Sequence, residues 1–327
     1  MWFYFKDSKT FKTKCAAVSA DYSTVEGSIY DDLSTITVEY NENISDNDII
    51  FNNNGYIGIV QDGEKQGNLL QLNCANIVNL FNRDIIYDKT KPTAGIEEYL
   101  KNKLLLNFVN LTDKKYALSY LNISADSTTL KTAIPDVDNG VCNFKSYIGK
   151  IRRLYNIFVE FEVKHTSLDV NIVKRDENTK QVILNNTAVT IEEETFSQTN
   201  VAKITSYVKD TGESKDWYLL TNGSITNDRT AVNRADGEWI ILQVSNTDEI
   251  EDEVRNKFKE NSFSHKIVFS VKSSEARFNF YDNLKIELNK KIYKSYIATK
   301  TVNSNGLTQY QCGELRTTLT DKIKELI

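Results

Sequence analysis

The sequence predicts a β-rich α+β protein in which two β-rich units are each interrupted by a helical segment. Short runs of alternating apolar and polar residues recur along the chain, whereas helical spacing appears in only a few segments. The 327 residues include 17 tyrosines and 15 phenylalanines, which favour sheets, and only two prolines. This length favours two or three domains, and the scarcity of proline indicates that the joins between them are short or interleaved.

The composition is that of a folded chain without a membrane segment. Hydrophobic residues make up 40% and charged residues 26% of the sequence, and the net charge is −5. An acidic balance argues against broad contact with nucleic-acid phosphates, which requires a basic face. No apolar run approaches the length of a membrane span, and the apolar N-terminus is too short for a signal sequence. We expect synthesis in a reducing cytosol.

The first third of the chain is predicted to be mostly strands. Residues 52–55, with the sequence NNNG, predict a hairpin turn, and residues 62–67 are expected to form a loop. Helical spacing of Cys74, Ile77 and Phe81 then predicts a short helix over residues 73–82. Alternation and β-forming residues predict strands over residues 2–5, 11–19, 34–40, 49–51 and 56–61.

Two helices and two strands follow in the middle of the chain. Residues 94–108 carry apolar side chains at helical spacing, with Glu97 and Glu98 in the first turn, where the helix dipole favours them. Residues 144–155 predict a further amphipathic helix. It leads directly into alternating runs over residues 157–163 and 168–173, which predict a pair of strands.

The last part of the chain is again β-rich and closes with a meander. Residues 304–306, with the sequence SNG, predict a tight turn between two closing strands. The strand over residues 292–302 is apolar on both faces. We expect Ile292, Tyr296 and Ala298 to pack inside and Ile297 to contact a neighbouring chain. Strands are predicted over residues 182–184, 189–192, 202–209, 217–220, 239–244, 266–271, 284–288, 292–302 and 307–312, and a helix over residues 249–263.

The sequence offers little catalytic chemistry. His165 and His265 are the only histidines, and the sequence contains no G-x-S-x-G, H-E-x-x-H, Walker or G-x-G-x-x-G motif. A nucleophile and base formed by Cys142 and His165 is conceivable, but two unrelated residues are the favoured interpretation. We expect no catalytic, cofactor-binding or metal-binding residues.

Two patterns that point to ions have simpler explanations. Residues 136–140, with the sequence DVDNG, lack the spacing and the distal glutamate of a calcium loop, so a simple turn is favoured. The densest basic cluster is expected to be a solvated helix face, with contact to an anion or an acidic partner as the alternative. It consists of Lys145, Lys150, Arg152 and Arg153.

Cysteines and tryptophans are both expected in the core. The cysteines are far apart and form no C-x-x-C pair, so buried free thiols are favoured over a metal site or a disulfide scaffold. A carbohydrate-binding protein would need an exposed aromatic cluster. Trp217 and Trp239 are the candidates for it outside the N-terminus, and both lie in predicted strands, so the core is favoured. The cysteines are Cys15, Cys74, Cys142 and Cys312.

Three places in a fixed order resemble the central tail hub, or baseplate hub, family of long-tailed bacteriophages and related phage-tail-like particles. The first is a strand that begins at Gly55, then a loop and a short helix that ends over residues 79–86. The second is the helix at 147–155 running into strand 157–163. The third is the closing meander from Asp282 to Gly313. At residues 282–284, DNL replaces the Gly-Asp pair that is more usual in the family.

The resemblance implies two tail-tube-like β-barrels per chain with α/β insertions, and three chains assembled as a trimeric ring. The expected domains are residues 1–90 as the first barrel unit and 91–175 as an α/β insertion with closing strands. Residues 176–327 are expected to form the second barrel unit, with a helical insertion at about 248–263. A ring of three chains with six similar barrels can seat on a sixfold tube.

The resemblance also implies a structural, non-enzymatic role in a virion tail, contractile or non-contractile, that joins the sixfold tail tube to a threefold distal tip or spike. The implied partners are the homotrimer itself and the tail tube, tape measure, distal tail or baseplate and spike proteins, with DNA only as passing cargo. Because the chain stops at Ile327, we expect no C-terminal peptidase. The alternatives are a tail-associated cell-wall hydrolase or peptidase, and a carbohydrate- or receptor-binding tail protein.

Overall fold

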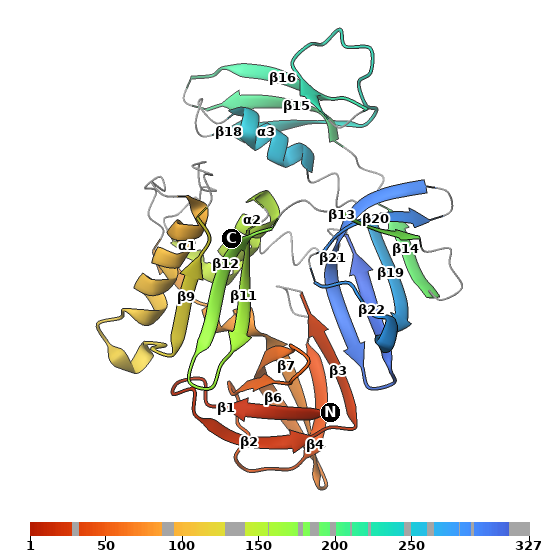
Figure 1. Cartoon of the computed structure of the whole chain (residues 1–327). Helices are drawn as coiled ribbons and strands as arrows, with labels where there is room; N and C mark the ends of the chain where they lie inside the picture. The colour runs from red at the N-terminus through yellow and green to blue at the C-terminus, as the bar shows by residue number, and fades with distance from the viewer. Residues whose placement is uncertain are drawn as a thin grey trace. The chain divides into compact units, whose positions relative to one another are not determined.

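The protein is β-rich with few helices, as Figure 1 shows for the computed structural model. The chain divides into two compact units. Unit 1 comprises Met1–Asn178, Lys272–Ala276 and Thr299–Thr308, and unit 2 comprises Thr179–Val271, Arg277–Ala298 and Gln309–Ile327. The structure describes residues 1–27, 33–86, 95–127, 141–155, 157–175, 179–183, 190–196, 201–209, 211–221, 224–244, 250–259, 265–280, 282–288 and 291–313.

Unit 1 begins with an antiparallel sheet built from the first seven strands. Its strand order is β3-β4-β7-β6-β5-β1-β2, and the last residues of β21 (Lys291–Asn303) pair with β3. Among the described residues this path is open, with no pairing of β2 to β3 that would close it into a barrel. The strands are β1 (Trp2–Lys6), β2 (Thr13–Val18), β3 (Asp21–Glu26), β4 (Ser34–Glu39), β5 (Ile49–Phe51), β6 (Ile57–Gln66) and β7 (Leu69–Asn76).

Two predictions for this sheet are wrong, and one strand was missed. Residues 62–66, expected in a loop, continue β6 and pair with β7, and the chain turns at Gly67 with a φ of 63°. Their polar side chains reflect an exposed strand rather than a loop. A helix is predicted over residues 73–82, but residues 73–76 belong to strand β7 because they pair with β4 and β6. Within the predicted range, only η1 (Ile77–Phe81) is helical. β3 was not predicted.

The rest of unit 1 packs helices against a small three-stranded sheet. The predicted helices and strands of this region are confirmed, although the first helix is shorter and ends in a wider turn, η2 (Leu105–Val109). β11 pairs antiparallel with β12, which pairs in parallel with β9. The elements are β8 (Asp84–Ile86), α1 (Ile96–Leu104), η3 (Lys114–Tyr116), β9 (Leu121–Ala125), β10 (Val141–Asn143), α2 (Phe144–Tyr155), β11 (Ile157–Val163) and β12 (Leu168–Lys174).

A buried lysine and an aromatic stack join the two parts of unit 1. Lys6 Nζ donates hydrogen bonds to the carbonyls of Phe11 at 3.2 Å and His165 at 2.8 Å. The Phe11 ring stacks on Tyr120 with centroids 4.7 Å apart, and the Tyr120 hydroxyl donates to the Ser8 carbonyl at 2.6 Å. Burial lowers the pKa of Lys6 and raises that of Tyr120. These contacts between the two parts of unit 1 are therefore hydrogen bonds to carbonyls and ring stacking, not ion pairs.

Unit 2 contains two groups of strands. In the first, β13 (Thr179–Ile183) runs parallel to β20 (Asn283–Leu288), which pairs with β21, and β14 (Thr190–Phe196) pairs with β19 (His265–Lys272). β22 (Leu307–Cys312) lies between β19 and β21. The second group is a four-stranded sheet accompanied by α3 (Ile250–Lys259); its strands are β15 (Val201–Val208), β16 (Ser214–Leu219), β17 (Ile225–Thr226) and β18 (Glu238–Val244). The short helix η6 (Ser273–Glu275), which follows β19, belongs to unit 1.

The predicted orientation of the closing strand is wrong. Ile297, expected to face a neighbouring chain, is 0% exposed within the single chain, whereas Tyr296, expected inside, is only half-buried. Ala298 is buried as predicted, and the side chain of Ile292 lies outside the described residues. Because both faces of this strand are apolar, alternation alone does not distinguish the core face from the outer face.

Candidate functional site

The candidate residues for nucleophilic catalysis lie on different elements of the fold. Cys142 is half-buried in β10, where it pairs with Ile85 of β8. His165 is exposed in the turn between β11 and β12, as predicted, and its carbonyl is the acceptor for Lys6. His265 begins β19 in unit 2, and its side chain lies outside the described residues. Nothing in this placement favours a nucleophile–base pair.

The predictions about ions have separate outcomes. The residues of the incomplete calcium loop, 136–140, lie outside the described residues. In the part of the chain that the structure describes, no three His, Cys, Asp or Glu side chains gather as metal ligands would.

All four cysteines are free thiols; Cys74 and Cys312 are buried, while Cys15 and Cys142 are half-buried. Burial raises the thiol pKa of Cys15, Cys74 and Cys312, so these thiols stay protonated.

The basic cluster of α2 is not a solvated face throughout. Lys145 donates from Nζ to the Asn79 side-chain carbonyl at 2.7 Å, so it fastens the helix to η1. Arg152 is buried, contrary to the prediction. The side chains of Lys150 and Arg153 lie outside the described residues. A shared anion-binding role for the four residues therefore has no support in the described geometry.

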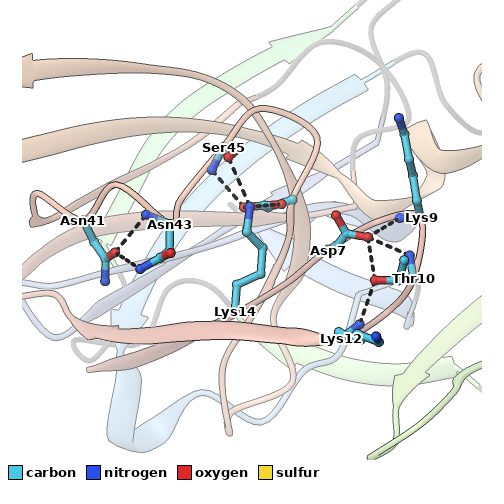
Figure 2. Close-up of polar contacts among 9 residues, drawn as sticks. Asp7, Lys9, Thr10, Lys12, Lys14, Asn41, Asn43 and Ser45 are labelled. Atoms are coloured by element: carbon cyan, nitrogen blue, oxygen red, sulfur yellow. Dashed lines mark hydrogen bonds and ion pairs between the residues drawn. The ribbon is translucent and has the colours of Figure 1, made fainter.

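A polar network fixes the loops beside β2 (Figure 2). Lys14 Nζ contacts Asp48 at 2.7 Å and the Ser45 hydroxyl at 3.1 Å, and Asp48 accepts the Ser45 amide at 2.8 Å. In the preceding turn, Asp7 accepts hydrogen bonds from the amide and hydroxyl of Thr10, which lower the pKa of its carboxyl group. These groups satisfy one another, so the network shapes loops and leaves no reactive group.

An open hollow lies beside β8, with a volume of about 480 Å³. It combines apolar side chains with a few charged ones, and Arg83 packs its guanidinium over the Phe108 ring at 4.7 Å. Tyr116, Ile86 and its partner Val141 are exposed nearby. The hollow is lined by Arg83, Asp84, Ile85, Ile86, Asn107, Leu111, Thr112, Asp113 and Tyr116.

The four-stranded sheet of unit 2 has one face covered by α3 (Figure 1). Trp217 is buried on this covered face, and its indole Nε1 donates to the Ser206 hydroxyl at 3.0 Å. Ile204, Val254 and Phe258 complete the packing. The side chains that alternate with these residues along the strands must point to the opposite face.

That opposite face is here called the Trp239 face. Trp239 is 63% and Ile241 71% exposed, so the prediction that Trp239 lies in the core is wrong. Tyr207, on the neighbouring strand, is 39% exposed. The face consists of Lys203, Thr205 and Tyr207 on β15, Asp216 and Tyr218 on β16, and Trp239, Ile241 and Gln243 on β18, with Arg234 over Tyr218.

A polar network holds the Trp239 ring in place. Trp239 Nε1 donates to Thr205 Oγ1 at 2.8 Å, and Thr205 donates in turn to Asp216 Oδ1 at 2.5 Å. Lys203 Nζ lies 4.2 Å from the centre of the Trp239 ring and 2.8 Å from Asp216 Oδ2. The hydrogen bond from Lys203, followed by that from Thr205, lowers the pKa of Asp216, so the carboxylate is charged at neutral pH. An exposed indole is thereby fixed in orientation.

Aromatic rings and cations alternate across this face. Lys203 lies between the Trp239 and Tyr218 rings, at 4.2 Å and 5.7 Å from their centres, and Arg234 stacks on Tyr218 at 4.8 Å. The strand propensity of tryptophan gave no sign of this, because Trp217 and Trp239 both lie in β-forming runs. The available signal was the alternation of Trp239 and Ile241 with Ile240 and Leu242, which leaves both faces of β18 apolar.

Comparison with known proteins gives matches at the level of structure. No family model and no curated protein matches the sequence. The prophage tail protein gp18 from Listeria monocytogenes EGD-e matches with a TM-score of 0.60 at 11% identity, covering 100% of this chain and 98% of that chain. A tail protein from Neisseria meningitidis MC58 matches with a TM-score of 0.55 at 10% identity, covering 95% and 96%.

A chain of the phage P2 baseplate in its activated conformation matches with a TM-score of 0.51 at 14% identity, covering 97% of this chain and 99% of that chain. At these identities the likeness concerns the fold, and it extends over nearly the whole length of each chain. It agrees with the resemblance of the sequence to the tail hub family. This chain therefore has the fold of phage tail and baseplate proteins.

Proposed function

We propose that this chain is a structural protein of a phage tail or phage-tail-like particle and acts there as the tail hub. The observation that carries the proposal is the match to the Listeria prophage tail protein, which covers 100% of this chain and 98% of that chain. A match limited to one barrel or one insertion would have suggested a shared module, whereas a match over both units favours a shared role.

In this proposal three chains form a closed ring that seats on the sixfold tail tube and presents a threefold tip. The support is the presence of two β-rich units in one chain, since three such chains supply six units around one axis. The proposal includes two closed tube-like barrels, at residues 1–90 and 176–327, with residues 91–175 as the α/β insertion and closing strands between them. The tail tube, tape measure, distal tail or baseplate and spike proteins are the proposed neighbours, and DNA passes through the ring.

The proposed role is not enzymatic. It is supported by the small number of histidines and by the placement of Cys142 in β10 and of His165 in the turn between β11 and β12. None of the helices in the described ranges is long and apolar enough to cross a membrane. We propose synthesis in the host bacterial cytoplasm and a final location in the particle tail.

The test is to image particles assembled with a chain that carries a small C-terminal label. The label is expected at the distal end of the tail, in three copies around the axis. A label along the tube, on the head or absent from particles would contradict the proposal. Particles assembled with an unlabelled chain provide the control.

A second candidate function, a carbohydrate-binding tail protein, has one specific observation in its favour. This function needs an exposed aromatic cluster. Trp239 is exposed and held in a fixed orientation, and Tyr207 on the neighbouring strand is 39% exposed. The two functions are compatible, because a structural tail protein can also carry a surface that contacts a glycan.

A further inference from the structure

We propose that the Trp239 face of unit 2 binds a linear saccharide chain that contains N-acetylated sugars. This site goes beyond a structural role in a tail, and it does not depend on that role. Its centre is the exposed ring of Trp239, and its flanks are Ile241, Gln243 and Tyr207.

The indole ring has the properties of a sugar-stacking platform. An aromatic ring carries negative charge density on its faces, which attracts the polarised C–H groups of a pyranose ring. Trp239 is 63% exposed, and its Nε1–Thr205 hydrogen bond holds the ring in one orientation. Lys203 Nζ lies over one face of the ring at 4.2 Å, so a sugar would stack on the opposite face. A platform that is already ordered loses little conformational entropy when a ligand binds.

The charges on this face favour a neutral ligand rich in hydroxyl groups. Lys203 and Asp216 lie next to the platform and neutralise each other at 2.8 Å. Arg234 is a further cation of this face, and it stacks on Tyr218, which pairs with Lys203 across β15 and β16. A nucleic-acid phosphate chain would need several uncompensated cations. The balanced charge complements an uncharged saccharide instead.

The neighbours of Trp239 on the same strand match an acetamido group. Ile241 is 71% exposed and lies two residues along β18, so it offers an apolar contact for a methyl group. Gln243 follows on the same face, and its side-chain amide can donate to a carbonyl and accept from an N–H. The order of ring, apolar contact and amide matches an N-acetylated sugar better than a plain glucose unit.

The length of the face points to a chain rather than a single sugar. Tyr207 lies four residues along β15 from Lys203, which pairs with Trp239, so the two aromatic residues are separated by about 13 Å of strand. The surface is an open sheet face and not a deep pocket. Weak binding by each sugar, added along a chain, is therefore expected.

The test measures binding of chitohexaose and cellohexaose to the full chain by isothermal titration calorimetry. Both are linear chains with the same linkage, and they differ in the acetamido group that only chitohexaose carries. We expect the chain to bind chitohexaose and to bind cellohexaose about tenfold more weakly or not detectably. No binding of either saccharide, or equal binding of both, would overturn the proposal.

Variants locate the site. Trp239→Ala is expected to weaken chitohexaose binding by about tenfold or more. Trp2→Ala is the matched control, because Trp2 is 56% exposed on β1 of unit 1, and it should bind as the parent does. Circular dichroism checks that both variants remain folded. If Trp239→Ala does not fold, Ile241→Ser replaces it and is expected to reduce the preference for chitohexaose over cellohexaose.

Two results with these variants would overturn the proposal. Equal loss of binding in Trp239→Ala and Trp2→Ala would place the effect outside the Trp239 face and overturn the proposal. If Trp239→Ala leaves saccharide binding unchanged but alters self-association in sedimentation, the face is a protein contact and the proposal fails. Neither outcome bears on the structural tail role, which the label in the particle tests separately.

Discussion

At the scale of single residues, one tryptophan of the four-stranded sheet is expected to contribute to stability and the other to binding at the surface. Trp217 and Trp239 both lie in strands of the same sheet, and both donate an indole hydrogen bond to a hydroxyl group. The bond of Trp217 to Ser206 is buried beneath α3, whereas the bond of Trp239 to Thr205 is exposed. The Ser206 hydroxyl also donates to the Lys215 carbonyl at 3.2 Å, so loss of the indole would leave its oxygen without a donor, and a buried acceptor without a donor is destabilising.

We therefore expect Trp217→Phe to destabilise the protein by about 1–3 kcal/mol, since the Ser206 hydroxyl loses its buried donor. Trp239→Phe is the matched control and is expected to change stability by less than about 0.5 kcal/mol. Urea denaturation followed by circular dichroism measures both variants. Equal destabilisation by the two changes would contradict the assignment of the two sheet faces.

The lowered pKa of Asp216 makes a stability contribution that depends on pH. Hydrogen bonds from Lys203 and Thr205 hold the pKa of the folded state below 3.8, the ordinary value for aspartate. The contribution is present above 3.8 and is lost as the pH falls through the lower pKa of the folded state. Because the side chains of Lys203 and Asp216 are 27% and 40% exposed, this contribution to stability should amount to only about 0.2–1 kcal/mol.

Asp216→Asn tests this pH dependence. The difference in urea midpoint between parent and variant is expected to be largest near neutral pH and to disappear in acid, below the folded-state pKa of Asp216. A difference that is constant across this range would mean that the carboxylate charge does not contribute.

At the scale of elements, the closing strand β21 belongs to the core of the single chain. Ile297 is 0% exposed there, with Leu284 and Ile286 of the neighbouring β20 also fully buried. A charge at this position would be buried without a partner. Its effect is thus expected on folding rather than on assembly, which reverses the expectation from the sequence.

Ile297→Asp is predicted to destabilise the chain by about 3–5 kcal/mol or to prevent folding, because burying an unpaired carboxylate is costly. Ile241→Asp is the matched control, as Ile241 is 71% exposed on another strand, and it should remain folded. Thermal unfolding by circular dichroism compares them. A folded Ile297→Asp chain that merely fails to assemble would restore the original interpretation of an outward-facing residue.

At the scale of the whole molecule, the proposed hub role requires self-association. We expect the chain, alone or in its particle, to form a closed ring of three copies. Light scattering at increasing protein concentration measures the assembly in solution, and symmetry analysis of particle images measures it in the tail. A stable hexamer in the particle, or a chain that is monomeric there, would contradict the threefold ring.

The absence of enzymatic activity is expected at the same scale. The parent chain should not clear peptidoglycan or casein in a zymogram, with lysozyme and trypsin as positive controls. His165→Ala and His265→Ala should behave as the parent does. Hydrolysis by the parent that disappears in either variant would replace the structural role with that of a tail-associated hydrolase.

Local patterns in the sequence determined the β-rich class, α2 with the β11–β12 pair, and most strands of unit 2. In these segments, the spacing of apolar residues matches the secondary structure that the tertiary contacts then stabilise. The same patterns led to two errors in unit 1. The polar side chains of residues 62–66 predict a loop, although these residues pair with β7. The spacing of Cys74 predicts a helix, although Cys74 pairs with β4.

In strands that carry apolar residues on both faces, contacts in the folded chain decided which of these residues are exposed. Trp217, Trp239 and Ile297 all lie in strands with apolar residues on both faces, so the spacing of apolar residues does not tell which of the three side chains is buried. The position of α3 covers the face of Trp217 and leaves that of Trp239 open, while strand packing encloses Ile297. Burial depends on contacts between residues far apart in the chain, and the candidate saccharide site on the Trp239 face could therefore be recognised only after folding was known.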